Sequence, residues 1–244
     1  MTLERLTTIM RRLRDPVNGC EWDRVQDFSS IAPYTIEEAY EVADAIARND
    51  MESLADELGD LQLQVVFHSQ MAAEAGHFTV GDVLDRICDK LERRHPHIFR
   101  DAAASPGWEA LKAAERTTSE DKSALAGVAN ALPALERAVK LQRRAARIGF
   151  DWPDVEGPRA KIVEELQELE VAETQAERVD ELGDLLFAVV NFARHLNVDP
   201  EAALREANRK FERRFRAIEV DPAFAGDLDA KEALWQAAKL AQSD

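Results

Sequence analysis

Two groups of acidic residues, each repeated once along the chain, have the spacing of a metal site. Glu38 and Glu41 are three residues apart, as are Glu57 and Asp60 further on. Residues three or four apart share a helix face, so two packed helices can direct four carboxylates into one cleft. The second half repeats the pattern with Glu165, Glu168, Glu181 and Asp184. The chain therefore carries two candidate sites of four carboxylates each.

Carboxylates gathered in this way predict a hard divalent cation. Without one, four neighbouring anions would repel one another by an energy on the order of several kcal/mol at an intermediate dielectric constant. Mg²⁺, with Mn²⁺ as a substitute, prefers carboxylate oxygen and keeps water positions open for substrate phosphates. A single acidic helix face is usually only solvated surface. The recurrence of the whole pattern in both halves favours the metal site.

A glycine lies inside each acidic segment, because Asp-Glu-Leu-Gly-Asp-Leu occurs at both 56–61 and 180–185. Glycine in a helix interior costs roughly 1 kcal/mol relative to alanine. Gly59 therefore predicts the close approach of a neighbouring helix, which would place the acids beside packed core.

Cationic residues also recur. Lys210 and Arg214 are four residues apart on one predicted helix face, as are Lys90 and Arg94 in the first half. A triphosphate requires metal for its bridging oxygens and Lys or Arg for its remaining charge. For this segment taken alone, an ordinary salt-bridged helix is the favoured interpretation.

The two halves differ next to the acids. Lys161 precedes Glu165 by one helical turn, whereas the first copy has Tyr34 at that position. Asn191 lies seven residues after Asp184 on the same face, where it could offer an amide to a base, and the first copy has Phe67 instead. These differences predict that the second domain carries most of the turnover.

Two tryptophans occupy matching turns. Gly19-Cys20-Glu21-Trp22 is echoed by Gly149-Phe150-Asp151-Trp152. Core packing is the favoured role for Trp22 and Trp152, and stacking on a base is the alternative.

The repeats predict an all-α protein of two tandem helical-bundle domains. We place these domains at residues 1–116 and 132–244, joined by a linker at 117–131. Asp50 is a predicted N-cap, Thr79 with Asp82 resembles a capping box, and Asp199 precedes a first-turn proline. Leu54, Leu58, Leu61 and Val65 form one apolar stripe on the predicted helix after Asp50.

Composition limits the function classes. The formal net charge of −16 argues against binding to nucleic acid polymers, whose affinity depends on Lys and Arg. Two cysteines make no disulfide framework, and no segment is long and apolar enough for a membrane span, so we expect a cytoplasmic protein. A P-loop motif is absent from the sequence.

The chain resembles MazG-type nucleoside triphosphate pyrophosphohydrolases, in the all-α class that also contains dimeric dUTPases. The resemblance rests on Glu-Glu-x-x-Glu followed by Glu-x-x-Asp, on residues 15–23, and on the Lys-x-Glu-Arg-Arg-His-Pro-His run at 90–97. It covers nearly the whole chain, and tandem duplication is typical of the longer bacterial members.

This resemblance implies Mg²⁺-dependent hydrolysis of a nucleoside triphosphate between the α and β phosphates, and a homodimer. It also implies that the second-domain acids (Glu165, Glu168, Glu181 and Asp184) bind metal and support catalysis. Side chains facing the nucleotide would be Lys161, Lys210, Arg214 and Trp235. Three functions remain open. The chain could be a broad house-cleaning enzyme or a relative selective for particular nucleotides. It could also be a non-enzymatic helical module that binds metal or a partner protein.

Overall fold

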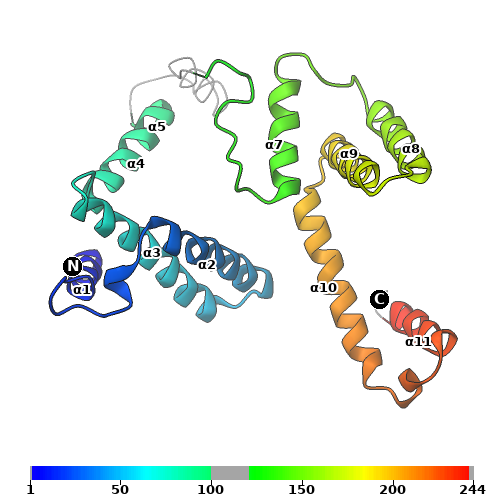
Figure 1. The fold of residues 1–244 in the computed structure, drawn as a ribbon, viewed down its shortest axis with the longest axis horizontal. Coiled ribbons are helices and arrows are strands. Elements are labelled where there is room, and N and C mark those ends of the chain that lie inside the picture. Colours follow the sequence, from blue (N-terminus) through cyan, green and yellow to red (C-terminus); the bar gives the residue numbers. More distant parts are fainter. Residues whose placement is uncertain (1, 100–120, 242–244) are drawn as a thin grey trace. The chain divides into compact units, whose positions relative to one another are not determined.

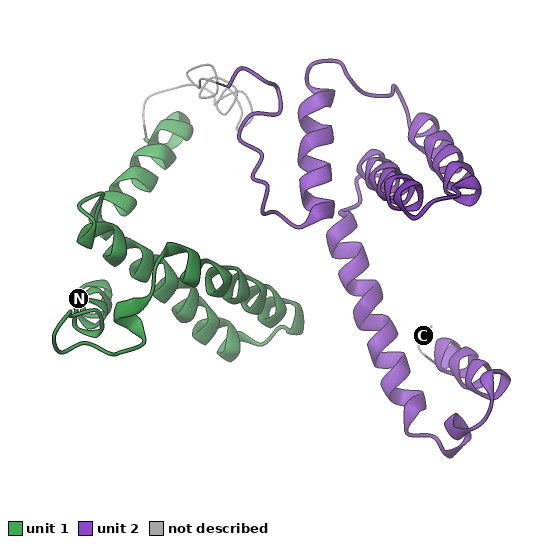
Figure 2. Ribbon diagram, viewed as in Figure 1, with its two compact units in different colours: residues 1–114 green, residues 115–244 purple. Residues whose placement is uncertain are grey.

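The computed structural model describes residues 2–99 and 121–241, and these residues contain helices and turns without a β-strand. The all-α prediction is therefore confirmed. The chain divides into two compact units, residues 1–114 and 115–244 (Figure 2). The linker expected at 117–131 lies partly outside the described residues, and its bounds stay a prediction.

Unit 1 is built around a pair of long helices, α2 and α3, which pack against each other (Figure 1). The chain turns between them at Asn49, whose left-handed backbone has φ 55°. Helix α1 packs on α3 and closes the core of this unit. The helices of unit 1 are α1 (Thr2–Leu13), η1 (Asp23–Val25), α2 (Phe28–Arg48), α3 (Met51–Glu74), α4 (Val80–Arg94) and α5 (Pro96–Phe99).

Unit 2 repeats the central pair as α8 and α9, with α7 packed on α9. A second pair, α10 and α11, follows in the chain, and α11 lies beside α10 and apart from α8 and α9 (Figure 1). The helices of unit 2 are α7 (Ala134–Ala146), α8 (Glu156–Val171), α9 (Gln175–His195), α10 (Pro200–Glu219), η2 (Pro222–Ala225) and α11 (Leu228–Ala241).

Side-chain caps begin these helices where the sequence predicts them. Asp50 accepts a hydrogen bond from the Ser53 backbone N–H at the start of α3. Thr79 and Asp82 form a reciprocal capping box at α4. Asp199 caps α10, whose first residue is a proline. Each cap satisfies backbone donors that have no partner within the helix.

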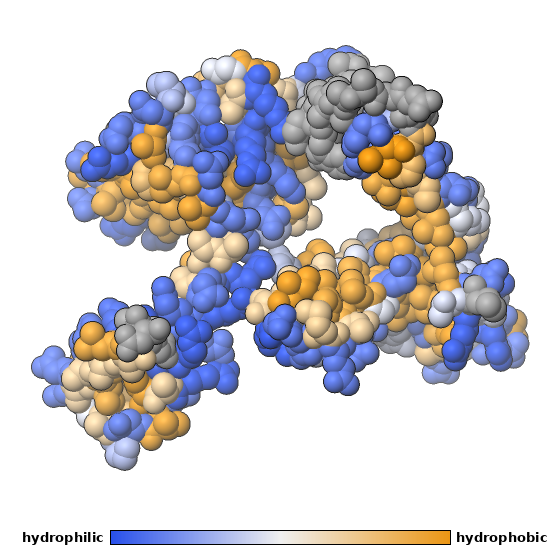
Figure 3. Space-filling view, turned by 180° about the vertical axis from the view of Figure 1, so that it is seen from behind, coloured by the Kyte–Doolittle hydropathy of each residue, from blue (hydrophilic) through white to orange (hydrophobic). Residues whose placement is uncertain are grey.

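The core of unit 1 is small and leaves apolar side chains at the surface. Met10, Ile31, Val66, Phe67 and Met71 form its buried cluster. The predicted stripe on α3 is only partly covered, because Leu58 and Val65 are exposed. Figure 3 shows hydrophobic surface beside hydrophilic surface on both units.

The close helix approach predicted at Gly59 is wrong within the described residues. A Cβ atom built at Gly59, or at Gly183 in unit 2, would meet nothing within 4 Å. Both glycines lie on the exposed side of their helices. The acids are therefore held by the packing of α2 on α3 and of α8 on α9.

Candidate metal and nucleotide site

The acidic residues of unit 2 meet between α8 and α9. Glu165 and Glu168 project from α8 and Glu181 from α9, and one carboxylate oxygen of each lies within 4.8 Å of the others. The fourth predicted acid, Asp184, is one turn after Glu181 and lies outside this group of three. We call Glu165, Glu168 and Glu181 the unit 2 acidic cluster.

Glu165 is the buried member of the unit 2 acidic cluster, with 2% of its surface exposed. Lys161, one turn earlier on α8, forms ion pairs with Glu165 and with Glu164, the latter at 2.8 Å. These contacts raise the pKa of Lys161 and keep it charged. The Oε2 atom of Glu165 is buried and has no hydrogen-bond partner among the described residues.

A buried carboxylate oxygen without a partner is costly, so it indicates a missing ligand. The donor set around Glu165 consists of carboxylate oxygens, which suit hard divalent cations such as Mg²⁺ and Mn²⁺. Partial burial, followed by the charges of Glu168 and Glu165, raises the pKa of Glu181 above its usual value. A cation between these groups would remove that repulsion. The residues present therefore fit a divalent metal.

Unit 1 repeats the cluster with different neighbours. Glu38, Glu41 and Glu57 bring ligand atoms within 4.8 Å of one another. Burial, followed by the charges of Asp60 and Glu41, raises the pKa of Glu38. Gln64 donates a long hydrogen bond of 3.4 Å to Glu38, and no lysine corresponds to Lys161. Both units can therefore gather three acids, but only unit 2 places a cation beside them within the described residues.

Comparison with known proteins agrees with the arrangement of two acidic helix pairs. Residues 26–99 match the MazG nucleotide pyrophosphohydrolase domain, and residues 132–211 match phosphoribosyl-ATP pyrophosphohydrolase. The nucleoside triphosphate pyrophosphohydrolase of Escherichia coli K12 is 49% identical over an alignment of 259 positions, which includes 99% of this chain and 98% of that protein. The chain belongs to the MazG nucleoside triphosphate pyrophosphohydrolase family. The Thermotoga maritima protein named nucleoside triphosphate pyrophosphohydrolase/pyrophosphatase MazG is 50% identical over 222 residues, 88% of this chain and 85% of the relative.

The expected nucleotide-binding residues of this MazG family chain fall into two places. Lys161 lies in the unit 2 acidic cluster, whereas Lys210 and Arg214 are on α10 and Trp235 is on α11. The Trp235 ring packs on Phe211 with ring centroids 5.3 Å apart. Helix α11, which carries Trp235, lies apart from α8 and α9 (Figure 1).

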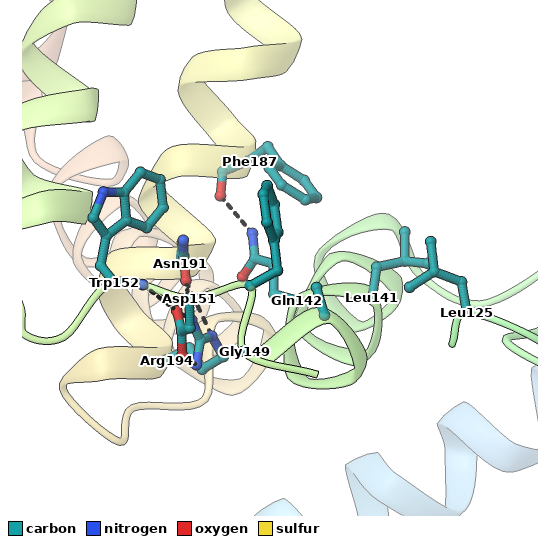
Figure 4. Close-up of a pocket in the computed structure, with 11 residues that line it drawn as sticks. Leu125, Leu141, Gln142, Gly149, Asp151, Trp152, Phe187, Asn191 and Arg194 are labelled. Atoms are coloured by element: carbon teal, nitrogen blue, oxygen red, sulfur yellow. Dashed lines mark hydrogen bonds and ion pairs between the residues drawn. The ribbon is translucent and has the colours of Figure 1, made fainter. Parts of the chain in front are cut away.

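A cavity of about 600 Å³ opens where α7 and α9 meet the turn before α8 (Figure 4). Trp152 and Phe187 contribute aromatic surface, and Gln142 and Asn191 contribute buried amides. The core position favoured for Trp152 is wrong, because this residue is 42% exposed and lines the cavity. The turn before α8 leaves Trp152 at the surface. The matching turn of unit 1 does the same for Trp22, which is 50% exposed.

Sequence reasoning placed Asn191 near the acids but missed Gln142 and the ion pair behind Asn191. Arg194 donates to Asn191 Oδ1 at 3.0 Å and to Asp151 Oδ2 at 2.9 Å. Hydrogen bonds from Arg194 and His195 lower the pKa of Asp151 to about 2.

Among the helices that the structure describes, none is long and apolar enough to cross a membrane.

Proposed function

We propose that the unit 2 acidic cluster is the catalytic centre of a nucleoside triphosphate pyrophosphohydrolase that cleaves between the α and β phosphates. The products are a nucleoside monophosphate and pyrophosphate. This proposal rests on Oε2 of Glu165, which is buried and has no hydrogen-bond partner in the part of the chain that the structure describes. Glu165 belongs to a cluster in which one carboxylate oxygen of each member lies within 4.8 Å of the others. The names of the E. coli and T. maritima relatives support the reaction class.

Glu165, Glu168 and Glu181 would hold Mg²⁺, or Mn²⁺ in its place, with Asp184 completing the set from one turn further along α9. A bound divalent ion of this kind polarises phosphate oxygens and lowers the pKa of a coordinated water. The protein positions the carboxylates that would bind this ion. The α8–α9 packing fixes the carboxylates, and Lys161 forms an ion pair with Glu165 and adds positive charge at the edge of the cluster.

Unit 2 is the proposed main catalytic unit. Lys161 gives its cluster a cation that can also face a triphosphate, whereas the matching Tyr34 brings no positive charge at neutral pH. In unit 1 the position of Asn191 is taken by Phe67, which is 3% exposed and belongs to the core. Unit 1 would therefore be weaker, differently selective, or retained for assembly.

Lys210, Arg214 and Trp235 are proposed to contact the nucleotide across a homodimer. Trp235 is on α11, a helix that lies apart from α8 and α9 of the same copy, and this supports a contribution from the second copy (Figure 1). Exposed apolar side chains on α9, including Leu182, Leu186 and Val189, leave surface for such an interface.

A second substrate is favoured by one observation. Residues 132–211 match phosphoribosyl-ATP pyrophosphohydrolase, which by its name removes pyrophosphate from a different nucleotide. Phosphoribosyl-ATP therefore belongs in the substrate panel. The near full-length identity to nucleoside triphosphate pyrophosphohydrolases ranks it below the triphosphates.

Pyrophosphate release from the common ribo- and deoxyribonucleoside triphosphates tests the proposal. We expect release from at least one of them with Mg²⁺ and none after EDTA, with turnover restored by added Mg²⁺. Release that continues in metal-free buffer would contradict the metal site. Failure to release pyrophosphate from any triphosphate would leave the non-enzymatic module.

A further inference from the structure

Two adjoining cavities lie along the C-terminal half of α3 in unit 1. One has a volume of about 570 Å³ and is bordered by α1, α3 and the segment around η1. The other, of about 410 Å³, is bordered by α1, α3 and the start of α4. Arg11, Gln70 and Glu74 line both cavities, which therefore adjoin. A rise of about 25 Å along α3 separates Glu74 from Glu57, so these cavities are distinct from the acidic cluster of unit 1.

Arg14 fixes the walls of the larger cavity. Its side chain is 8% exposed, and its Nη2 donates to Glu74 Oε2 at 2.8 Å while its Nε donates to both oxygens of the same carboxylate. The remaining nitrogen, Nη1, donates to the carbonyl oxygens of Asp23 and Gln26, the latter at 3.2 Å. This one buried side chain ties α1, α3 and the η1 segment together. The larger cavity is therefore formed by the protein itself before a ligand binds.

The acidic groups that line the larger cavity are already satisfied by donors of the protein. Arg14 and Gln70 donate to the Glu74 carboxylate. Two backbone N–H groups of the following turn donate to Asp15 at 2.7 and 3.0 Å, and they lower the pKa of this residue. Neither carboxylate depends on a ligand for its hydrogen bonds.

Two arginines of the same cavity differ from Arg14 in this respect. Arg11 and Arg24 line the cavity without a hydrogen-bond or ion-pair partner in the part of the chain that the structure describes. Unpaired guanidinium groups at one cavity, in a chain with a formal net charge of −16, favour an anionic ligand. The planar fork of a guanidinium matches the oxygens of a phosphate group.

The smaller cavity offers hydrogen-bond acceptors. Thr7 and Ser69 line it, and each hydroxyl donates to a backbone carbonyl oxygen, at 2.9 and 2.8 Å. The Thr79 hydroxyl donates to the Asp82 carboxylate at 2.7 Å. Gln70 uses its Nε2 on Glu74, which turns its Oε1 away from that carboxylate. Because the donors are used within the protein, the oxygens that remain suit a ligand with hydroxyl groups.

We propose that the two cavities form one site for a hydroxylated organic phosphate, of the chemical class of the sugar phosphates. The phosphate group pairs with Arg11 and Arg24, and the hydroxyl groups donate to the oxygens of the smaller cavity. Arg14 is a positioning residue that holds the walls. The site is separate from the proposed catalytic centre, so its ligand is bound and not hydrolysed there.

Unit 2 does not repeat this arrangement in its described residues. Counted from the shared Asp-Glu-Leu-Gly-Asp-Leu segment, Val198 takes the position of Glu74, and Arg194 takes the position of Gln70. Arg194 is paired with Asp151. A carboxylate that could hold a counterpart of Arg14 is therefore missing at this point of α9. The proposed site gives unit 1 a binding role of its own.

Calorimetric titration of the full-length protein in EDTA tests the site without metal and therefore without hydrolysis. The probes are ribose 5-phosphate, glycerol 3-phosphate, inorganic phosphate, sulfate and ribose. The Arg11→Gln/Arg24→Gln variant removes the two unpaired charges. Its matched control is Arg5→Gln/Arg12→Gln, which removes the same charge from exposed arginines of α1 that line neither cavity.

In the wild type we expect at least one of the two organic phosphates to bind about tenfold more tightly than inorganic phosphate or sulfate, and ribose not to bind. Arg11→Gln/Arg24→Gln should weaken this binding by about tenfold or more, because it removes charge-assisted hydrogen bonds. Arg5→Gln/Arg12→Gln should match the wild type. Thr7→Val removes one acceptor at similar volume, so it should reduce the preference for the organic phosphate and leave the affinity for inorganic phosphate unchanged.

The proposal is overturned if neither organic phosphate binds, or if the two double variants weaken binding equally. Sulfate binding as tight as that of the organic phosphates would show an unselective anion site and would also overturn it. Folding is checked by circular dichroism. If Arg11→Gln/Arg24→Gln fails to fold, the ranking of the probes in the wild type and the effect of Thr7→Val still decide the question.

Discussion

Lys161 forms an ion pair with Glu165, the residue one turn further along α8, while the second carboxylate oxygen of Glu165 has no partner among the described residues. This arrangement places a charged lysine at the edge of the anionic cluster and leaves Oε2 of Glu165 inside the cluster to coordinate a metal ion. Substituting either residue should change stability and activity in ways that distinguish a metal site from a solvated surface.

The lysine can be removed with a matched control on the same helix. Lys161→Ala leaves the buried Glu165 carboxylate without its counter-ion, so we expect lower thermal stability without metal and about a tenfold lower kcat/KM. Arg159→Ala removes an exposed side chain whose ion pair with Glu156 is solvated, and it should change both quantities little. Thermal melts and steady-state kinetics of the two variants make the comparison. Equal effects would assign Lys161 a merely surface role.

The acidic clusters predict a pH dependence of stability in metal-free protein. The pKa of Glu181 is raised in the folded state, so its contribution is fully present below its ordinary pKa of 4.5. It is lost as the pH rises through the raised pKa. We therefore expect Mg²⁺ to raise Tm more at neutral pH than at acid pH, and Glu181→Gln to reduce this difference. Glu170→Gln, at an exposed position on α8, is the control and should keep the wild-type difference between the two pH values. If Glu181→Gln also keeps that difference in the Mg²⁺-induced rise of Tm, the clustered arrangement is contradicted.

The Asp151–Arg194 pair predicts the opposite pH dependence. The pKa of Asp151 is lowered from 3.8 to about 2, so its contribution is present above pH 3.8 and lost as the pH falls toward 2. This shift corresponds to about 2 kcal/mol of unfolding free energy. We expect Asp151→Asn to be less stable than the wild type near neutral pH and equal to it near pH 2. Denaturant unfolding followed by tryptophan fluorescence gives both values, and a difference that persists at pH 2 would rule out the ionised pair as its cause.

Assembly of the site across a homodimer predicts complementation. Glu165→Gln and Arg214→Ala should each be inactive or weakly active alone. If Arg214 acts in the site of the second copy, mixed dimers contain one intact site, and the mixture should recover up to about a quarter of wild-type turnover. Subunit exchange is measured by pyrophosphate release after mixing. Absence of recovery in mixtures with demonstrated exchange would place Arg214 in the site of its own copy or outside any site.

The acidic pairs and the helix caps could be predicted because they depend on spacing within one helix. Glu165 and Glu168 share a face by helical geometry alone, and Asp50 caps α3 through the backbone three residues on. The cavity where α7 and α9 meet the turn before α8 could not be predicted in this way. The bond from Gln142 to Phe187 joins residues 45 positions apart, a pairing that only the packing of α7 on α9 determines.

The prediction at Gly59 failed for a related reason. A glycine inside a helix has a cost that local sequence shows, but the compensating neighbour must come from tertiary or quaternary packing. Within the described residues that space is open. Trp152 is a similar case, because its Gly-x-Asp-Trp turn is visible in the sequence, whereas its seat on Gly157 at the mouth of a cavity is not.

The most direct test of the central claim compares the same substitution in the two clusters. Glu165→Gln and Glu38→Gln each remove one carboxylate charge from a full-length protein whose other cluster is intact. Pyrophosphate release from a hydrolysed nucleoside triphosphate is measured for both with Mg²⁺, and folding is checked by circular dichroism. We predict that Glu165→Gln lowers kcat/KM by about 100-fold or more and that Glu38→Gln leaves most of the activity. Loss of activity in Glu38→Gln with retention in Glu165→Gln would show that the catalytic centre is in unit 1.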